Sequence, residues 1–260
     1  MSRKDLSRRS LLLSGGAAAL GAAGLLAGGT PAGASPAGAT PAGATPVGTS
    51  PLGTSSLGAV VAEEPAVTPT AALGRLLAGN RRFVAGHARH PHQGLQDLHD
   101  LATGQHPFAI TIGCADSRVS PEVLFDQGLG DIFDNRVAGN IVDDLLLGSI
   151  EFAVEEFASP LIVVLGHERC GAINATINAI TSGSTAPGHI ATIVDALRPI
   201  IEPVLTRPGD PVDNAVRANI EAQTAELVQR SNLIADHIAA GKVRVVGARY
   251  DLDNGHVTLL

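Results

Sequence analysis

The chain has 260 residues, of which 45% are hydrophobic and only 3% aromatic, and its formal net charge is −7. The first 34 residues carry four basic side chains and one acidic one, so the remainder has a net charge of −10. Such an acidic chain lacks the Lys and Arg surface that binds phosphate backbones, and the scarcity of aromatic residues disfavours base stacking. Nucleic acid is therefore not an expected partner, and the length predicts one sizeable domain with extensions.

Residues 1–34 have the layout of an export signal. A basic stretch ends in the pair Arg8-Arg9, an apolar run with four glycines follows at 11–27, and small residues suited to cleavage end at Ala34. The adjacent arginines resemble a twin-arginine signal, a route that exports folded proteins. The alternative is a membrane anchor, but a glycine-rich run of about 17 residues is near the lower limit for a span. We expect cleavage, no remaining membrane anchor, and a periplasmic or extracellular protein.

A five-residue repeat of the type TPAGA fills residues 30–59. Its prolines remove backbone donors, its glycines add conformational entropy, and no unit can bury a useful apolar face. The repeat predicts a disordered linker over 35–68 and a folded domain over 69–260.

The folded domain alternates helical and strand patterns. Helices are expected, from their apolar spacing and capping residues, at 68–86, 120–127, 140–157, 171–180, 189–205, 212–229 and 231–240. Strands are expected at 108–114, at 131–138, at 161–167, and on both sides of an Asn254-Gly255 turn. This alternation predicts an α/β fold with a mostly parallel central β-sheet flanked by helices.

Two short stretches, CADSRV at 114–119 and HERCG at 167–171, contain the two cysteines of the chain. Cys114 and His167 each end a run that reads as a buried strand, and ligands bind at the carboxyl ends of parallel strands. If these strands are neighbours, the two side chains lie within ~5–10 Å of each other.

Zinc prefers Cys thiolates and His nitrogens in tetrahedral geometry, and its catalytic sites keep one position for water. His167 and Cys170 are three residues apart, Cys114 supplies a second thiolate, and Asp116 is a candidate fourth ligand. Two cysteines in an exported protein also suggest a disulfide. Separately, Asp116 and Arg118 could form a plain structural ion pair. A zinc protease is rejected, because its HExxH motif requires a second His where Gly171 stands.

The CADSR and HERCG motifs together resemble those of the beta-class carbonic anhydrases. Other segments resemble that family in the same order, namely PEVLFDQGLGDIF, NRVAGNIVDD, LGSIEFAV and VVGARYDLDNG. The resemblance covers about residues 70–260 and implies that the folded domain is a catalytic zinc domain, a carbonate dehydratase that interconverts carbon dioxide and bicarbonate.

The resemblance also implies roles for individual residues. Cys114, His167 and Cys170 would hold one zinc ion per chain, which lowers the pKa of a bound water from 15.7 toward ~7 and so supplies hydroxide. Asp116 and Arg118 would form the family's pair: while they are engaged, the fourth zinc position is open to water, and when they separate, Asp116 can bind zinc.

Further implications concern neighbouring subunits and substrate. Gln127 matches a glutamine that helps to hold substrate across a dimer interface, although it could simply end a helix. The family implies a homodimer or homotetramer, with the helix near 70–85 reaching a partner. A same-fold hydrolase of carbonyl sulfide or carbon disulfide, and a non-catalytic zinc-binding or redox protein, remain alternatives. The His-rich segment 87–106 suggests either a proton relay or second metal site, or simply a solvated loop.

Overall fold

The computed structural model describes residues 67–260, so the expected export signal and all but the last two residues of the expected linker lie outside the described residues. Its helices are α1 (Pro69–Val84), α2 (Leu95–Asp100), α3 (Pro121–Leu124), α4 (Asp144–Phe157), α5 (Gly171–Ser182), α6 (Ile190–Ile201), the 3-10 turn η1 (Glu202–Val204), α7 (Pro211–Arg230) and α8 (Asn232–Ala239). Its strands are β1 (Ala109–Gly113), β2 (Ile132–Arg136), β3 (Leu161–His167), β4 (Arg244–Tyr250) and β5 (Val257–Leu259).

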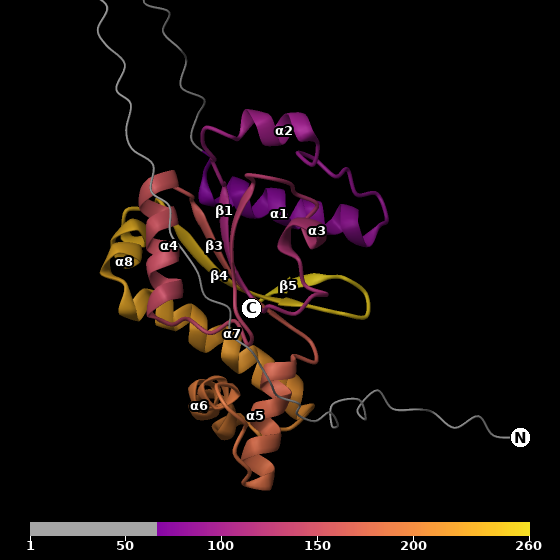
Figure 1. The fold of residues 1–260 in the computed structure, drawn as a ribbon, viewed down its shortest axis with the longest axis vertical. Coiled ribbons are helices and arrows are strands. Elements are labelled where there is room, and N and C mark those ends of the chain that lie inside the picture. Colours follow the sequence, from indigo (N-terminus) through magenta and orange to yellow (C-terminus); the bar gives the residue numbers. More distant parts are fainter. Residues whose placement is uncertain (1–66) are drawn as a thin grey trace, which may run out of the picture. The chain divides into compact units, whose positions relative to one another are not determined.

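The strands form one sheet in the order β2-β1-β3-β4-β5 (Figure 1). The first four are parallel and β5 is antiparallel to β4, which confirms the expected α/β fold with a mostly parallel sheet. Every residue of β1 and β3 is buried, as continuous apolar runs in a parallel sheet require. Because β1 and β3 are direct neighbours, their carboxyl ends lie side by side.

Helices cover both faces of the sheet, and alternate strand residues divide between two cores. One core contains buried residues of α4, α5, α6, α7 and α8 together with four strand residues, Ile110, Ile112, Ile162 and Val164. Residues of opposite parity on β3, including Val163 and Leu165, pack with α1 and α3 on the other face.

Helix α1 begins at the residue where the folded domain was expected to start. The Thr68 hydroxyl accepts a hydrogen bond from the backbone N–H of Ala71 and caps the helix. Near its other end, the buried Asn80 donates to the carbonyls of Leu124 and Gly255 and accepts from the N–H of Val257. The helix expected to reach a partner therefore buries one face against its own chain.

Three segments differ from the expectations. Helix α3 ends at Leu124, three residues earlier than expected, and Asp126 follows in the left-handed region with φ 48°. Helix α4 begins at Asp144 rather than at 140, because the Asp143 carboxylate caps it by accepting from the N–H of Leu146. The short helix α2 was not anticipated, and it lies within the His-rich segment.

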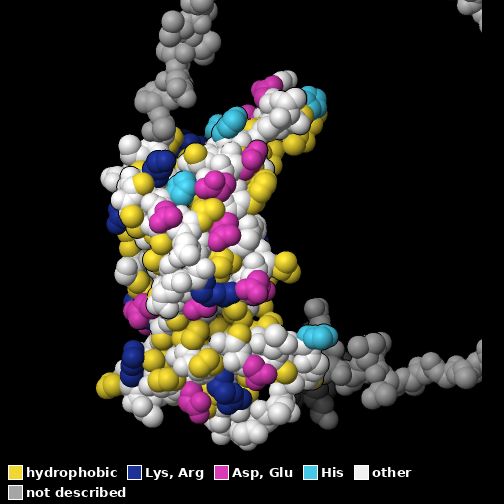
Figure 2. Space-filling model, turned by 90° about the vertical axis from the view of Figure 1, so that its left-hand side faces the viewer, with side chains coloured by type: hydrophobic (Ala, Val, Ile, Leu, Met, Phe, Trp, Pro, Cys, Tyr) yellow, Lys and Arg dark blue, Asp and Glu magenta, His cyan; other side chains and the backbone are white. Residues whose placement is uncertain are grey.

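The described surface mixes polar and apolar side chains. On the side where α4 and α8 lie, basic, acidic and apolar side chains are interspersed (Figure 2). Among residues 67–260, each helix is too short or too polar to cross a bilayer.

Candidate metal centre

Three side chains that can bind a metal meet where β1 and β3 end. Cys114 directly follows β1, His167 is the last residue of β3, and Cys170 directly precedes α5. One ligand atom from each lies within 4.8 Å of the other two, and all three residues are buried. The two Sγ atoms are 3.9 Å apart and both cysteines are free thiols, so the alternative of a disulfide is not realised.

His167 presents one ring nitrogen to this group. Its Nδ1 donates to the backbone carbonyl of Glu168 at 2.8 Å, which leaves the lone pair on Nε2. Nε2 is buried and has no hydrogen-bond partner among the described residues. A buried polar atom without a partner needs a physical explanation, and a metal ion held with the two sulfurs would provide it.

The two thiols are electrostatically linked. The pKa of Cys114 is lowered to about 4, chiefly by its hydrogen bond with the Cys170 thiol and to a smaller extent by the N–H of Gly139, against the opposing effect of burial. The Cys114 sulfur in turn raises the pKa of Cys170, as does burial. The pair thus holds one proton between two sulfurs, and thiolates are the form that binds metal. A set of two sulfurs and one imidazole suits zinc.

A carboxylate and a guanidinium lie beside these three side chains. Arg118 donates from Nε to Oδ1 of Asp116 at 2.9 Å and from Nη2 to Oδ2 at 2.8 Å, and its backbone N–H also bonds Oδ1. These bonds hold the pKa of Asp116 well below its usual range, so the carboxylate is ionised at neutral pH. Its Oδ2 lies 4.0 Å from Nε2 of His167.

Comparison with known proteins identifies the family. A protein-family model described as carbonic anhydrase matches residues 109–257. The fold is similar to that of a tetrameric beta-carbonic anhydrase from Sordaria macrospora, with a TM-score of 0.58 and 26% identity over 72% of this chain and 96% of the other. This chain belongs to the beta-class carbonic anhydrases.

Individual relatives agree with this assignment. Carbonic anhydrase 2 of Mycobacterium tuberculosis is 44% identical over 196 residues, which is 75% of this chain and 94% of the relative. The carbonic anhydrase of Mycolicibacterium smegmatis is 44% identical over 75% of this chain and 95% of its own. The expected enzyme class, a carbonate dehydratase, is thus confirmed at the level of the family.

Three hydrogen bonds from two residues near the candidate metal-binding side chains were missed by the sequence analysis. Arg136, at the end of β2, donates to the carbonyl of Cys114 at 3.0 Å and to that of Asp116 at 2.6 Å. The N–H of Gly139 donates to Sγ of Cys114 at 3.4 Å. Both belong to the NRVAG segment, whose family resemblance was the available signal. Together they hold the turn that carries Cys114 and Asp116.

Gln127 is not part of this group. Its side chain is buried, accepts from Nε of Arg75 at 3.1 Å and donates to the carbonyl of Phe125 at 2.8 Å. Arg75 also pairs with Asp131, the residue directly before β2. Gln127 therefore lies near the start of the strands, whereas the candidate metal-binding residues lie at or after the carboxyl ends of β1 and β3.

The His-rich segment also lies outside the group. His92 pairs through Nδ1 with Asp131 at 2.8 Å, and α2 occupies residues that were read as a possible loop. Within residues 67–260, the clusters suited to a metal are the Cys/His group and an acidic one of Glu168, Asp251 and Asp253. Neither cluster includes a histidine from 87–106.

Proposed function

We propose that this chain is an exported, zinc-dependent beta-class carbonic anhydrase that interconverts carbon dioxide with bicarbonate and a proton. One zinc ion per chain would be held by Cys114, His167 and Cys170. The observation that carries the proposal is the buried Nε2 of His167, which has no hydrogen-bond partner within residues 67–260 and lies with the two thiols beside the ionised Asp116. The 44% identity to carbonic anhydrases of mycobacteria supports the substrate assignment.

Zinc in such a site supplies Lewis-acid chemistry, activating water for attack on carbon dioxide. Within the chain, Asp116 would accept a hydrogen bond from the attacking group and so orient its lone pair. Arg118 keeps that carboxylate ionised and turned toward its own guanidinium through two parallel hydrogen bonds. In this arrangement Asp116 lies next to the proposed metal ligands but is not itself a ligand. His167 is held in the required tautomer by its Nδ1 hydrogen bond.

Carbon dioxide hydration tests the proposal directly. The purified chain is analysed for metal and assayed from pH 7 to 9 before and after removal of metal by a chelator, and after zinc is restored. We expect about one zinc per chain and activity that disappears and returns with the metal. A zinc-loaded protein without hydration activity would overturn the assignment and point to hydrolysis of carbonyl sulfide or carbon disulfide. Absence of zinc together with readily oxidised thiols would indicate a redox protein.

A homodimer or homotetramer is the assembly we propose. Beta-carbonic anhydrases from Sordaria macrospora are described as tetrameric, and α4 exposes the apolar side chains of Leu145 and Phe152. Gln127 would act toward the metal centre of a partner subunit, since its side chain contacts no member of its own centre within residues 67–260. Light scattering during gel filtration would test the assembly, and a monomeric active enzyme would contradict it.

Export through the twin-arginine route is proposed from residues 1–34 alone. Replacing Arg8 and Arg9 by lysine should retain the full-length precursor in the cytoplasm, whereas the native chain should be recovered outside it without its first residues. Cell fractionation and N-terminal sequencing measure both outcomes. Recovery of a cleaved, exported chain from the Lys variant would contradict this route.

A further inference from the structure

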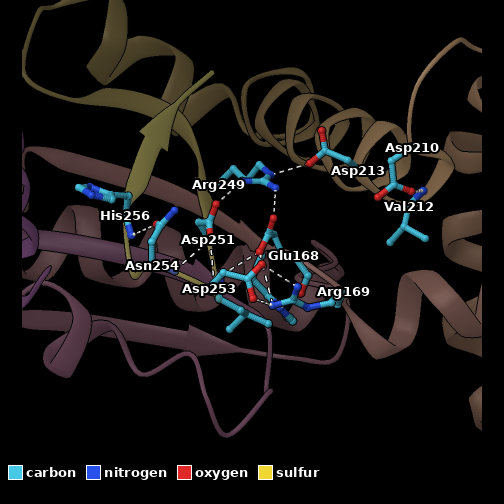
Figure 3. Close-up of polar contacts among 12 residues, drawn as sticks. Glu168, Arg169, Asp210, Val212, Asp213, Arg249, Asp251, Asp253, Asn254 and His256 are labelled. Carbon is cyan, nitrogen blue, oxygen red and sulfur yellow. Dashed lines mark hydrogen bonds and ion pairs between the residues drawn. The ribbon is translucent and has the colours of Figure 1, made fainter.

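A polar network joins the turn between the zinc-binding residues to two other elements of the fold (Figure 3). Its centre is Arg249 on β4, which donates from Nη2 to Glu168 and from Nε to Asp213 at 2.6 Å. Glu168 stands between His167 and Cys170, and Asp213 lies in the first turn of α7. One guanidinium thus connects the ligand turn to the sheet and to a helix.

The packing of the sheet explains why Arg249 reaches both partners. In the β3–β4 register, Arg249 lies opposite Gly166, one residue before the ligand His167. A Cβ on Gly166 would come within 2.5 Å of Ile220 on α7, and one on Gly247 would come within 2.8 Å of it. The two glycines therefore allow α7 to approach β3 and β4 closely, which brings Asp213 within reach of Arg249.

Each polar group of Glu168, in the backbone and in the side chain, takes part in a hydrogen bond. Its N–H donates to the carbonyl of Tyr250 at 3.1 Å, and its carboxylate accepts from Arg249 and from the N–H of Leu252 at 3.0 Å. Its own carbonyl accepts the Nδ1–H of His167. A displacement of Glu168 would therefore move the acceptor that sets the tautomer and orientation of the ligand imidazole.

The ligand turn requires such support. Arg169, which follows Glu168, has φ 51°, a left-handed conformation that is unfavourable for a residue with a side chain. The Arg249 and Glu168 side chains are only 12% and 18% exposed, so their ion pair is largely shielded from water. The pair between Arg169 and Asp253 is by contrast mostly exposed and contributes little to holding the turn.

We infer that Arg249 and Glu168 are positioning residues for the metal centre: the Arg249–Glu168 pair, anchored on Asp213, fixes the carbonyl that orients His167 toward the metal. Neither side chain is a ligand in this arrangement. The inference rests on the proposed zinc site and adds residues that act on it through the imidazole. Outer partners of a metal-bound histidine typically change metal affinity or activity by about 10–100-fold when they are removed.

Metal release from the zinc-loaded full chain tests the inference without measuring catalysis. Zinc transfer to excess chromogenic chelator is followed for the native chain and for Glu168→Gln, Arg249→Gln, Arg249→Lys and the double Gln variant. We expect release to be about 10–100-fold faster in both single Gln variants. Arg249→Lys should recover part of the loss, and the double variant should release zinc no faster than the worse single variant, because both remove one interaction.

The absorption spectrum of the cobalt-substituted protein gives a second readout, sensitive to ligand geometry. It should change in the Gln variants and remain native in Arg217→Ala, which removes the other guanidinium bound to Asp213 but leaves Glu168 untouched. If Arg249→Gln does not fold, the Glu168→Gln variant tests the positioning role alone. Its amide oxygen can still accept from the N–H of Leu252, so we expect it to fold.

The outcomes separate the two proposals. If the native chain binds zinc and the Gln variants release it within about twofold of the Arg217→Ala rate, with a native cobalt spectrum, the positioning role is overturned. If the native chain binds neither zinc nor cobalt, the proposed function fails instead.

Discussion

The Oδ2 atom of Asp116 lies 4.0 Å from Nε2 of His167 while Arg118 holds both oxygens of the same carboxylate. The carboxylate is thus close enough to contact a group bound at the centre, but its hydrogen bonds keep it turned to the guanidinium. In the proposed zinc site, this relationship would separate a residue that binds metal from one that orients the reacting group.

Replacing Asp116 by asparagine should therefore abolish most activity and leave metal binding intact. The amide lacks the charge that pairs with Arg118 and that accepts a hydrogen bond strongly, so we expect kcat/KM for hydration to fall by about 100-fold or more. Stopped-flow hydration and metal analysis measure the two effects. Asp253→Asn, which changes an exposed aspartate that also pairs with an arginine, is the matched control and should keep native activity. Unchanged turnover in Asp116→Asn would contradict the proposed role.

Metal removal should destabilise the fold, because the buried Cys114, His167 and Cys170 then lack their shared partner. At a zinc concentration 100 times the dissociation constant, binding contributes about 2.7 kcal/mol to the free energy of unfolding. We expect zinc to raise the thermal midpoint of the metal-free protein by about 5–10 °C. In scanning calorimetry, zinc should raise the thermal midpoint of the Cys114→Ser and Cys170→Ser variants much less. An equal response in the Ser variants would place the stabilising metal elsewhere.

Two glycines on α1 should respond oppositely to alanine. A Cβ on Gly79 would lie 1.6 Å from the carbonyl oxygen of Phe125, whereas one on Gly74 would meet no atom within 4 Å. Gly79→Ala must push α1 away from α3 and should destabilise the protein by at least about 2 kcal/mol. Gly74→Ala should stabilise it by up to about 1 kcal/mol through helix propensity. Urea unfolding compares the two, and similar effects would refute the close packing of α1.

Asp134 should make stability depend on pH. Burial raises its pKa from 3.8 to about 6, with a smaller contribution from the charge of Glu122, although Thr111 donates a hydrogen bond to it. The folded chain therefore binds this proton more tightly than the unfolded chain, and the contribution of Asp134 to the free energy of unfolding falls as pH rises from about 4 to about 6. The loss is about 3 kcal/mol at most.

Asp134→Asn removes this titration and keeps an acceptor for Thr111. The variant should match the native chain near pH 4 and exceed it in stability by about 2–3 kcal/mol above pH 7. Urea unfolding of both proteins from pH 4 to above pH 7 measures the difference between their free energies of unfolding. The titration of all other groups is common to both proteins and cancels in this difference. A difference that does not vary with pH would show that Asp134 titrates normally.

Local patterns predicted most of the fold. Strand β3 has the bounds that its continuous apolar run indicated, and α1 begins where the folded domain was expected to start. A shared site for Cys114 and His167 required β1 and β3 to be neighbours, and the register shows that they are. Helix α3 was overestimated, because the left-handed backbone at Asp126 is stabilised by long-range contacts with Arg82 and the N–H groups of Arg89 and His90.

The sequence by itself determined the family, the parallel sheet and the residues able to bind a metal, because apolar periodicity and motif spacing are local properties. Only the tertiary structure decided that Arg136 on β2 holds the carbonyl of Cys114 and that Glu168 is held by Arg249, 81 residues away. Such contacts depend on strand register and on how closely α7 approaches the sheet, and both are set by packing between distant segments.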